Sequence, residues 1–286
     1  MRFLSLFAGL LISLPLSLSA QADETKLLRV VSVGGALTEI VYALKADAQL
    51  VGVDTTSLYP EAATQLPQVG YQRQLSAEGV LSLKPDLVLV TEEAGPPAVL
   101  EQIQATGTKL IKLPSEYSAE GVVKKIQGVA DALNKTTEGK QLSASFTQDL
   151  AAVQAQLVKT EPPKVVFLLS MGKGSPMAAG GATAAHAMID LAGGKNAFAE
   201  THTGYKAVST EAMIAANPDL LLISKDTLTS LGGIDQALSA IPGLNLTNAG
   251  KKRRIVTMEG LHLLGFGPRL PQVAAELATL FHRPTH

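Results

Sequence analysis

The sequence predicts an α/β protein with two similar lobes joined by one long rigid helix, and with a ligand cleft between the lobes. Short apolar runs alternate with helical patterns in both halves of the chain, as they do in βα units. Two segments, Leu75–Thr91 and Val208–Ser224, align without a gap at an offset of 133 residues. Between the halves, Thr137–Lys159 has no proline, one glycine and many alanine, glutamine and leucine residues.

The first half has the element order of a βα lobe. Four apolar runs predict strands: Val30–Val33, Leu50–Val53, Leu87–Thr91 and Lys109–Leu113. Helical patterns predict four helices: Ala36–Leu44, Ser76–Leu83, Ala98–Ala105 and Ser118–Leu133. Residues 54–74 show neither pattern, and we expect irregular structure there.

The segment between the halves carries an apolar face at helical spacing. Its members are Leu142, Phe146, Leu150, Val153 and Leu157. At 1.5 Å per residue the helix is roughly 35 Å long, and the proline pair that follows Glu161 ends it. It is read as a rigid strut between two lobes, the alternative being an ordinary helix of one lobe.

The second half repeats the βα texture. We expect a strand at Val165–Leu169, a Gly-rich loop at Met171–Gly181 and a helix at Thr183–Leu191, followed by the repeated helix and strand. The remaining expected elements are a helix at Ile234–Ala240, a strand at Ile255–Thr257 and a final helix at Arg269–Phe281.

Met1–Ala22 is read as a secretory signal peptide. Arg2 precedes the apolar run Phe3–Leu18, and Ala20-Gln21-Ala22 is a small-x-small cleavage site. The alternative is a membrane anchor, which Pro15 disfavours because it interrupts the run. The expected division is therefore a signal peptide at 1–22, a first lobe at 23–135, a linking helix at 136–160 and a second lobe at 161–286.

Composition excludes several classes of protein. The chain has no cysteine, so disulfides, thiol metal sites and a lipid-modified cysteine are excluded, and we place the protein free in a bacterial periplasm. A formal charge of −1 argues against nucleic acid and against a polybasic membrane surface. The loop around Lys173 fails the phosphate-loop spacing, no histidine pair has metal-binding spacing, and no nucleophile–base pattern indicates an enzyme.

Tyr71 is the first candidate binding residue. It lies in an expected loop just before a helix, and Arg73 is two residues further along, on the same side of an extended segment. A guanidinium there favours the phenolate, a hard anionic oxygen suited to Fe(III), and tyrosine is a known axial ligand of haem iron. The alternative is a packing tyrosine with an exposed arginine.

Glu78 and Glu211 are equivalent residues of the two repeats. Each is expected in the first turn of a short helix that Ser76 or Ser209 can cap, where the helix dipole favours a carboxylate. That preference alone explains both residues. The functional alternative is one exposed acid per lobe that docks onto a basic partner.

The run Tyr71-Gln72-Arg73-Gln74-Leu75-Ser76-Ala77-Glu78-Gly79, together with the repeated Ser-x-Glu and Pro-Asp-Leu patterns, resembles a known family. The chain is similar to the periplasmic substrate-binding proteins of ABC importers with a rigid helical backbone, and within them to the haem-binding branch. Pro176–Gly180 and Gly193–Asn196 also resemble haem-branch segments.

The resemblance implies two Rossmann-like lobes with haem between them, as a transported ligand and without catalysis. Tyr71 would supply the axial phenolate, Arg73 would hydrogen-bond to it, and Glu78 and Glu211 would pair with arginines of the two subunits of an inner-membrane permease. The protein itself is expected to be a monomer. The runner-up ligand is cobalamin or a ferric siderophore, against which the absence of tryptophan weighs.

Further cleft candidates are weaker. Tyr205 occupies roughly the mirror position to Tyr71, and Lys206 and Arg254 are candidate partners of the haem propionates. Three methionines complete the candidates as soft apolar contacts: Met171, Met177 and Met258.

Overall fold

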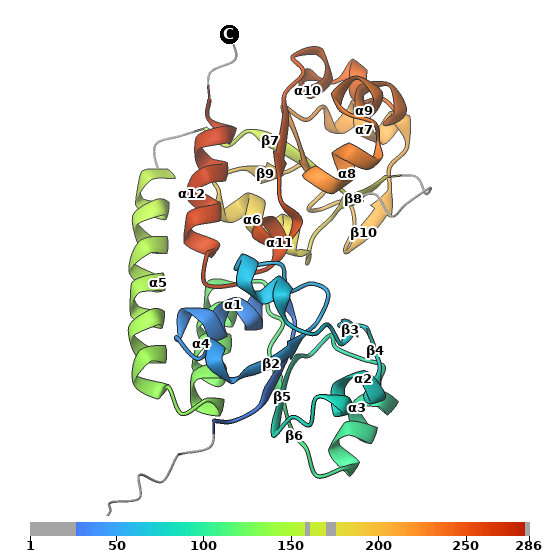
Figure 1. Cartoon of the computed structure of the whole chain (residues 1–286). Coiled ribbons are helices and arrows are strands. Elements are labelled where there is room, and N and C mark those ends of the chain that lie inside the picture. Colours follow the sequence, from blue (N-terminus) through green and yellow to red (C-terminus); the bar gives the residue numbers. More distant parts are fainter. Residues whose placement is uncertain (1–26, 158–160, 170–175, 284–286) are drawn as a thin grey trace, which may run out of the picture.

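The computed structural model describes residues 27–157, 161–169 and 176–283. The predicted signal peptide and Met171 lie outside these ranges. Within them the chain forms two α/β lobes, one above the other, with a long helix running beside both (Figure 1). No helix in this part of the chain is long and apolar enough to cross a membrane.

The first lobe is built on a four-stranded parallel sheet in the order β2-β1-β5-β6. Its strands are β1 (Val30–Val33), β2 (Leu50–Val53), β5 (Leu87–Thr91) and β6 (Lys109–Leu113). The two central strands, β1 and β5, are almost entirely buried, as expected for strands covered on both faces. All four strands confirm the ranges predicted from the sequence.

Helices cover both faces of this sheet. One face packs on α1 (Gly35–Ala43) and α4 (Ala119–Ala132), and the other packs on α2 (Ala77–Ser82) and α3 (Pro97–Ala105). Two 3-10 turns complete the lobe, η1 (Asp47–Gln49) and η2 (Glu61–Gln65). The predicted helices are confirmed to within one residue at each end.

Residues 54–74 are not wholly irregular. A short antiparallel hairpin forms there from β3 (Gly70–Tyr71) and β4 (Gln74–Leu75), with Tyr71 opposite Gln74. Gln72 and Arg73 are the two turn residues. The expectation that Tyr71 and Arg73 share one side of an extended segment is therefore wrong, because the chain reverses direction between β3 and β4.

The second lobe has a six-stranded sheet in the order β10-β8-β7-β11-β12, with β9 beside β7. Strands β7, β9, β11 and β12 are parallel, and β8 pairs antiparallel with both of its neighbours, β7 and β10. The ranges are β7 (Lys164–Leu169), β8 (Met177–Ala179), β9 (Lys195–Asn196), β10 (Tyr205–Ala207), β11 (Leu220–Ser224) and β12 (Ile255–Met258). The expected Gly-rich loop thus contains a strand, β8.

Short helices surround this sheet. They are α6 (Ala184–Leu191), α7 (Thr210–Ala216), α8 (Lys225–Ser230), α9 (Ile234–Ala240), α10 (Asn248–Lys251) and η3 (Leu244–Leu246). The chain ends with α11 (Gly260–Leu264) and α12 (Leu270–Phe281).

The aspartate of the repeated Pro-Asp pair has the same structural role in both lobes. Asp86 accepts a hydrogen bond from the backbone N–H of Arg29 at 2.9 Å, and its own N–H donates to the Arg29 carbonyl at 2.8 Å. Asp219 makes the same two bonds with Lys164, at 3.0 and 2.8 Å. In each lobe the repeated aspartate therefore joins the start of one central strand, β5 or β11, to its neighbour, β1 or β7.

The long helix α5 (Thr136–Leu157) is the strut that the sequence predicts. Its 22 residues span about 33 Å. It packs on α4 of the first lobe and on α12 of the second, and Phe146 and Leu150 are buried between them. Figure 1 shows α5 running beside both lobes.

Candidate ligand cleft

A cleft of about 450 Å³ lies between the lobes. Many of its lining residues follow the carboxyl ends of strands in both sheets, which is where open α/β sheets bind ligands. From the first lobe they include Gly34, Thr56, Gln72, Arg73, Thr91, Glu93, Ser115, Tyr117 and Lys125. From the second they include Leu169, Ala184, Tyr205, Asp226, Glu259 and Leu261.

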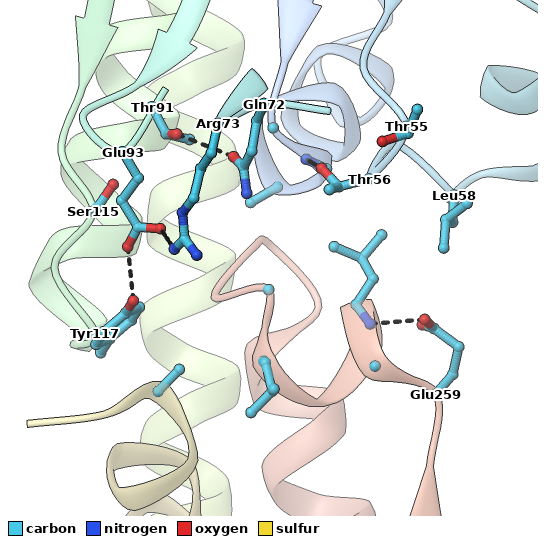
Figure 2. A pocket seen from close by; sticks show the side chains of 18 of the residues that line it. Thr55, Thr56, Leu58, Gln72, Arg73, Thr91, Glu93, Ser115, Tyr117 and Glu259 are labelled. Carbon is cyan, nitrogen blue, oxygen red and sulfur yellow. Dashed lines mark hydrogen bonds and ion pairs between the residues drawn. The ribbon is translucent and has the colours of Figure 1, made fainter. Parts of the chain in front are cut away.

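Arg73 of the β3–β4 turn reaches into this cleft and forms an ion pair with Glu93 (Figure 2). Glu93 also accepts a hydrogen bond from the Tyr117 hydroxyl at 2.8 Å. Burial would raise the pKa of Glu93, but the hydrogen bonds from Arg73 and Tyr117 hold it below its ordinary value. The carboxylate is therefore charged at neutral pH and fixes both neighbours.

Tyr117 is kept neutral. Burial, and then the hydrogen bond to Glu93, raise the pKa of Tyr117 to about 12. Its ring packs against Phe266, with centroids 5.5 Å apart. Tyr117 thus connects the first-lobe wall to a segment of the second lobe.

Lys125 lies in the cleft floor on the buried face of α4. Its side chain is almost fully buried, with the residue 4% exposed, and Nζ donates to the Phe266 carbonyl at 2.7 Å. Burial lowers the pKa of Lys125 to about 8, opposed by the attraction of Glu93. The ammonium group is thus largely protonated at neutral pH in spite of its burial.

A buried carboxylate shapes the first-lobe rim. Asp54 is fully buried and accepts hydrogen bonds from the backbone N–H of Gly34 at 2.9 Å and from the hydroxyls of Thr56 and Ser57 at 2.7 and 2.9 Å. Gly34 has φ 121°, and a Cβ there would lie 2.7 Å from Thr91. The network fixes the loops after β1 and β2, which line the cleft.

Tyr71 lies at the end of β3, beside the cleft. The residue is 39% exposed and, among the described residues, it is not one of those that line the cleft. Its neighbours Gln72 and Arg73 do line it. The hairpin therefore leaves Tyr71 exposed next to the turn that lines the cleft.

Tyr205 lines the second-lobe side. It lies on β10, and its ring meets Phe167 edge-on with centroids 6.4 Å apart. Burial raises the pKa of Tyr205, partly offset by hydrogen bonds with the Ala185 backbone and the Thr183 side chain. Lys206, the next residue, is exposed and does not line the cleft, because successive side chains of a strand point to opposite faces.

The remaining candidates do not line the cleft as described. Arg254 precedes β12 and donates to the Phe281 carbonyl at 2.9 Å, at the opposite end of that strand from Glu259. Met258 is buried and borders a second cavity of about 430 Å³, and Met177 is paired within the sheet on β8. Met171 lies outside the described residues.

Glu78 and Glu211 are exposed in the first turns of α2 and α7. The predicted caps are confirmed, because the Ser76 hydroxyl accepts from the Gly79 N–H at 3.3 Å and the Ser209 hydroxyl from the Ala212 N–H at 3.2 Å. The pKa of Glu211 is lowered by hydrogen bonds with its own backbone N–H and with Ser209. The repeat therefore places equivalent exposed acids, Glu78 and Glu211, on the two lobes.

Sequence reasoning missed three polar residues of the cleft: Glu93, Tyr117 and Lys125. Lys125 had a detectable signal, because it shares the helical spacing of Val122, Ile126 and Val129 and so falls on the apolar face of its helix. Glu93 and Tyr117 come from loops after β5 and β6, and nothing local pairs them.

Two α/β lobes, a single strut and a cleft between the lobes that both charged and apolar residues line define a bilobal ligand-binding protein. The chain belongs to the periplasmic binding protein family, whose profile matches residues 30–260. That family comprises substrate-binding proteins rather than enzymes, and its members work with ABC transporter permeases. The described ranges contain no group of three or more His, Cys, Asp or Glu side chains that could hold a metal ion.

Solved structures and curated relatives are similar to this chain. A periplasmic heme-binding protein RhuT from Roseiflexus sp. RS-1 is 43% identical with a TM-score of 0.86, covering 89% of this chain and 98% of that chain. A heme-binding protein BhuT in complex with two hemes is 42% identical with a TM-score of 0.85, covering 89% and 97%. A vitamin B12-binding protein of Yersinia pestis (strain Pestoides F) is 30% identical over 76% of this chain and 75% of that protein.

Proposed function

We propose that this protein captures ferric haem in the periplasm and delivers it to an inner-membrane ABC importer. The observation that carries the proposal is the β3–β4 hairpin, in which Tyr71 directly precedes two turn residues that line the cleft, Gln72 and Arg73. The similarity to heme-binding structures at 42 and 43% identity supports the same ligand.

In this proposal Tyr71 is the axial ligand of the iron. A phenolate is a hard anionic oxygen, and ferric iron prefers such donors. The exposed phenol can meet a flat ligand that enters from solvent, since it is not enclosed by other side chains.

Arg73 supports the phenolate in the proposed complex. Its guanidinium is paired with Glu93, but the Arg73 side chain is 54% exposed, and exposed ion pairs contribute only about 0–1 kcal/mol. The arginine can therefore be shared between Glu93 and an anionic Tyr71 at little cost.

The alternative ligand is cobalamin or a ferric siderophore. Vitamin B12-binding proteins at 30% identity favour the first of these. Lacking tryptophan, the chain has no indole on which a corrinoid face could stack, so this alternative ranks second.

Delivery would use Glu78 and Glu211. One exposed acid on each lobe fits a permease built from two subunits, each offering basic side chains. The protein would act as a monomer of two lobes, with the boundaries predicted at residues 135 and 160. Met171 stays a candidate for an apolar contact with the ligand.

An absorption titration with hemin tests the proposal. We expect the mature protein to give a shifted Soret band with high-spin ferric charge-transfer bands, and Tyr71→Phe to lose these bands. Tyr205→Phe is the matched control, since it removes the phenol on the other wall of the cleft. No Soret shift in the unsubstituted protein would favour cobalamin as the ligand. An identical Soret shift in Tyr71→Phe would require another iron ligand.

A further inference from the structure

Lys125 carries a charge in a place where proteins rarely leave one. Transferring an ammonium from water to the interior is costly unless a partner compensates it. Within the described residues, Nζ donates to the neutral Phe266 carbonyl, and no carboxylate lies within ion-pair distance of it. An ammonium has three donors, so two remain for another acceptor.

The charges around the cleft are unevenly placed. The first-lobe wall contributes Arg73, Lys125 and Glu93, a net charge of one positive unit, whereas the charged lining residues of the second lobe are Asp226 and Glu259. The Glu259 carboxylate accepts from the N–H groups of Leu261 and His262, at 2.7 Å each. An anionic ligand group is therefore attracted to the first-lobe side and repelled by the other.

Arg73 alone does not supply the positive charge that an anionic ligand group would meet. Glu93 neutralises its guanidinium, and Tyr117 holds Glu93 from the opposite side. Lys125 faces the same cavity, yet its interaction with Glu93 is through-space attraction rather than a contact. Of the two cations that line the cleft, Lys125 is therefore the one whose charge no carboxylate contact neutralises.

We propose that Lys125 is a carboxylate-recognition residue in the cleft floor, whose ammonium binds a carboxylate of the transported ligand. The inference rests on the proposed haem function and deepens it, since haem carries two propionate carboxylates. The ligand would then be held at two points, by the iron at the rim and by a carboxylate in the floor. The second point would also set its in-plane orientation.

A purely structural role is the competing explanation. Nζ joins α4 to the loop before α12 through the Phe266 carbonyl, and this contact alone could account for the residue. A test must therefore separate the charge from the hydrogen bond. Lys125→Gln keeps an N–H donor and removes the charge, and Lys125→Met removes both.

The experiment compares hemin with its dimethyl ester, in which both carboxylates are blocked. Dissociation constants are measured by Soret titration for the unsubstituted protein, Lys125→Gln, Lys125→Met and the control Lys124→Gln. Lys124 is the neighbouring residue on the same helix, exposed and paired with Glu116. A thermal melt of each variant checks that it is folded.

We expect both Lys125 variants to bind hemin roughly tenfold or more weakly, as for loss of a charge-assisted hydrogen bond, and to bind the ester as the unsubstituted protein does. Lys124→Gln should leave both constants unchanged. Equal loss for hemin and ester, or no loss for either, would overturn the assignment. If the unsubstituted protein binds neither ligand, the haem proposal itself fails and the inference falls with it.

Discussion

Arg269 Nε and Nη2 donate to the two carboxylate oxygens of Glu39 at 2.8 and 2.6 Å, and so join residues 230 positions apart. Glu39 lies on α1 of the first lobe, and Arg269 immediately precedes α12. Arg269 also donates to His262 Nδ1 at 2.7 Å and stacks on the Tyr59 ring, 3.7 Å from its centroid. This pair fastens the returning C-terminal segment to the first lobe.

Breaking this ion pair should destabilise the protein. The Glu39 side chain is 4% exposed, and Glu39→Gln leaves the Arg269 charge without its main partner. We expect the free energy of unfolding to fall by on the order of 3 kcal/mol, measured by urea denaturation. The control is Glu116→Gln, whose pair with Lys124 is exposed and should change stability by less than about 1 kcal/mol. Equal effects would show that the Glu39 pair is no stronger than a surface pair.

Both repeated aspartates should stabilise the protein, and Asp219 should do so more, because it also accepts a hydrogen bond from Asn248 Nδ2 at 3.1 Å. Asp86→Ala and Asp219→Ala each remove a carboxylate that holds the backbone N–H before a neighbouring central strand. We expect each substitution to lower the free energy of unfolding by about 0.5–1.5 kcal/mol, the net contribution of a hydrogen bond that is exposed to solvent. The hemin dissociation constant of each variant, measured where the variant is fully folded, should be unchanged. Both aspartates lie at the strand ends opposite the cleft. A loss of binding without a loss of stability would contradict the structural role.

Lys125 should make stability depend on pH in the alkaline range. Its pKa is about 8 in the folded protein and about 10.5 when unfolded, so between these values the unfolded chain binds the proton that the folded protein has released. Stability relative to Lys125→Met should therefore rise by about 3 kcal/mol from pH 8 to pH 10.5. Urea denaturation of both proteins across this range measures the difference. A stability difference that does not change with pH would mean that burial does not lower the pKa of Lys125.

The two exposed acids should matter for delivery and not for capture. Reversing both charges, Glu78→Lys with Glu211→Lys, should abolish haem-dependent growth of a strain that relies on this carrier, because basic permease side chains would be repelled. The hemin dissociation constant should stay within about twofold. The control reverses Glu101 and Glu200, which are also exposed, one in each lobe. Normal growth of the first double variant would contradict the docking role.

Local patterns predicted most of the fold. The strands β1 and β5 are continuous apolar runs, and the short helices α2 and α7 begin at serine caps, so their limits could be read without tertiary contacts. The strands β8 and β10 could not. They are three residues each and are stabilised by antiparallel pairing at a sheet edge rather than by their own pattern.

The site divides in the same way. Tyr71 and Arg73 could be selected because they adjoin a capped helix in sequence, although their turn was not foreseen. Glu93, Tyr117 and Lys125 come together from the ends of β5 and β6 and from α4, and only the packing of these elements makes them neighbours of Arg73. Arg254 was wrongly selected as a cleft residue. It precedes β12, whereas the cleft lies at the other end of that strand, and the sequence does not show which end faces the cleft.

The strut α5 and the pair between Glu39 and Arg269 together have a kinetic consequence for transport. If Glu78 and Glu211 dock onto the importer as proposed, a carrier whose lobes are held in this way would present both acids with or without its ligand. An importer with equal affinity for the two states could not select between them. Empty carriers would then occupy the importer as competitive inhibitors. Uptake should rise with carrier concentration only while most carriers are loaded, and should decline once unloaded copies are in excess.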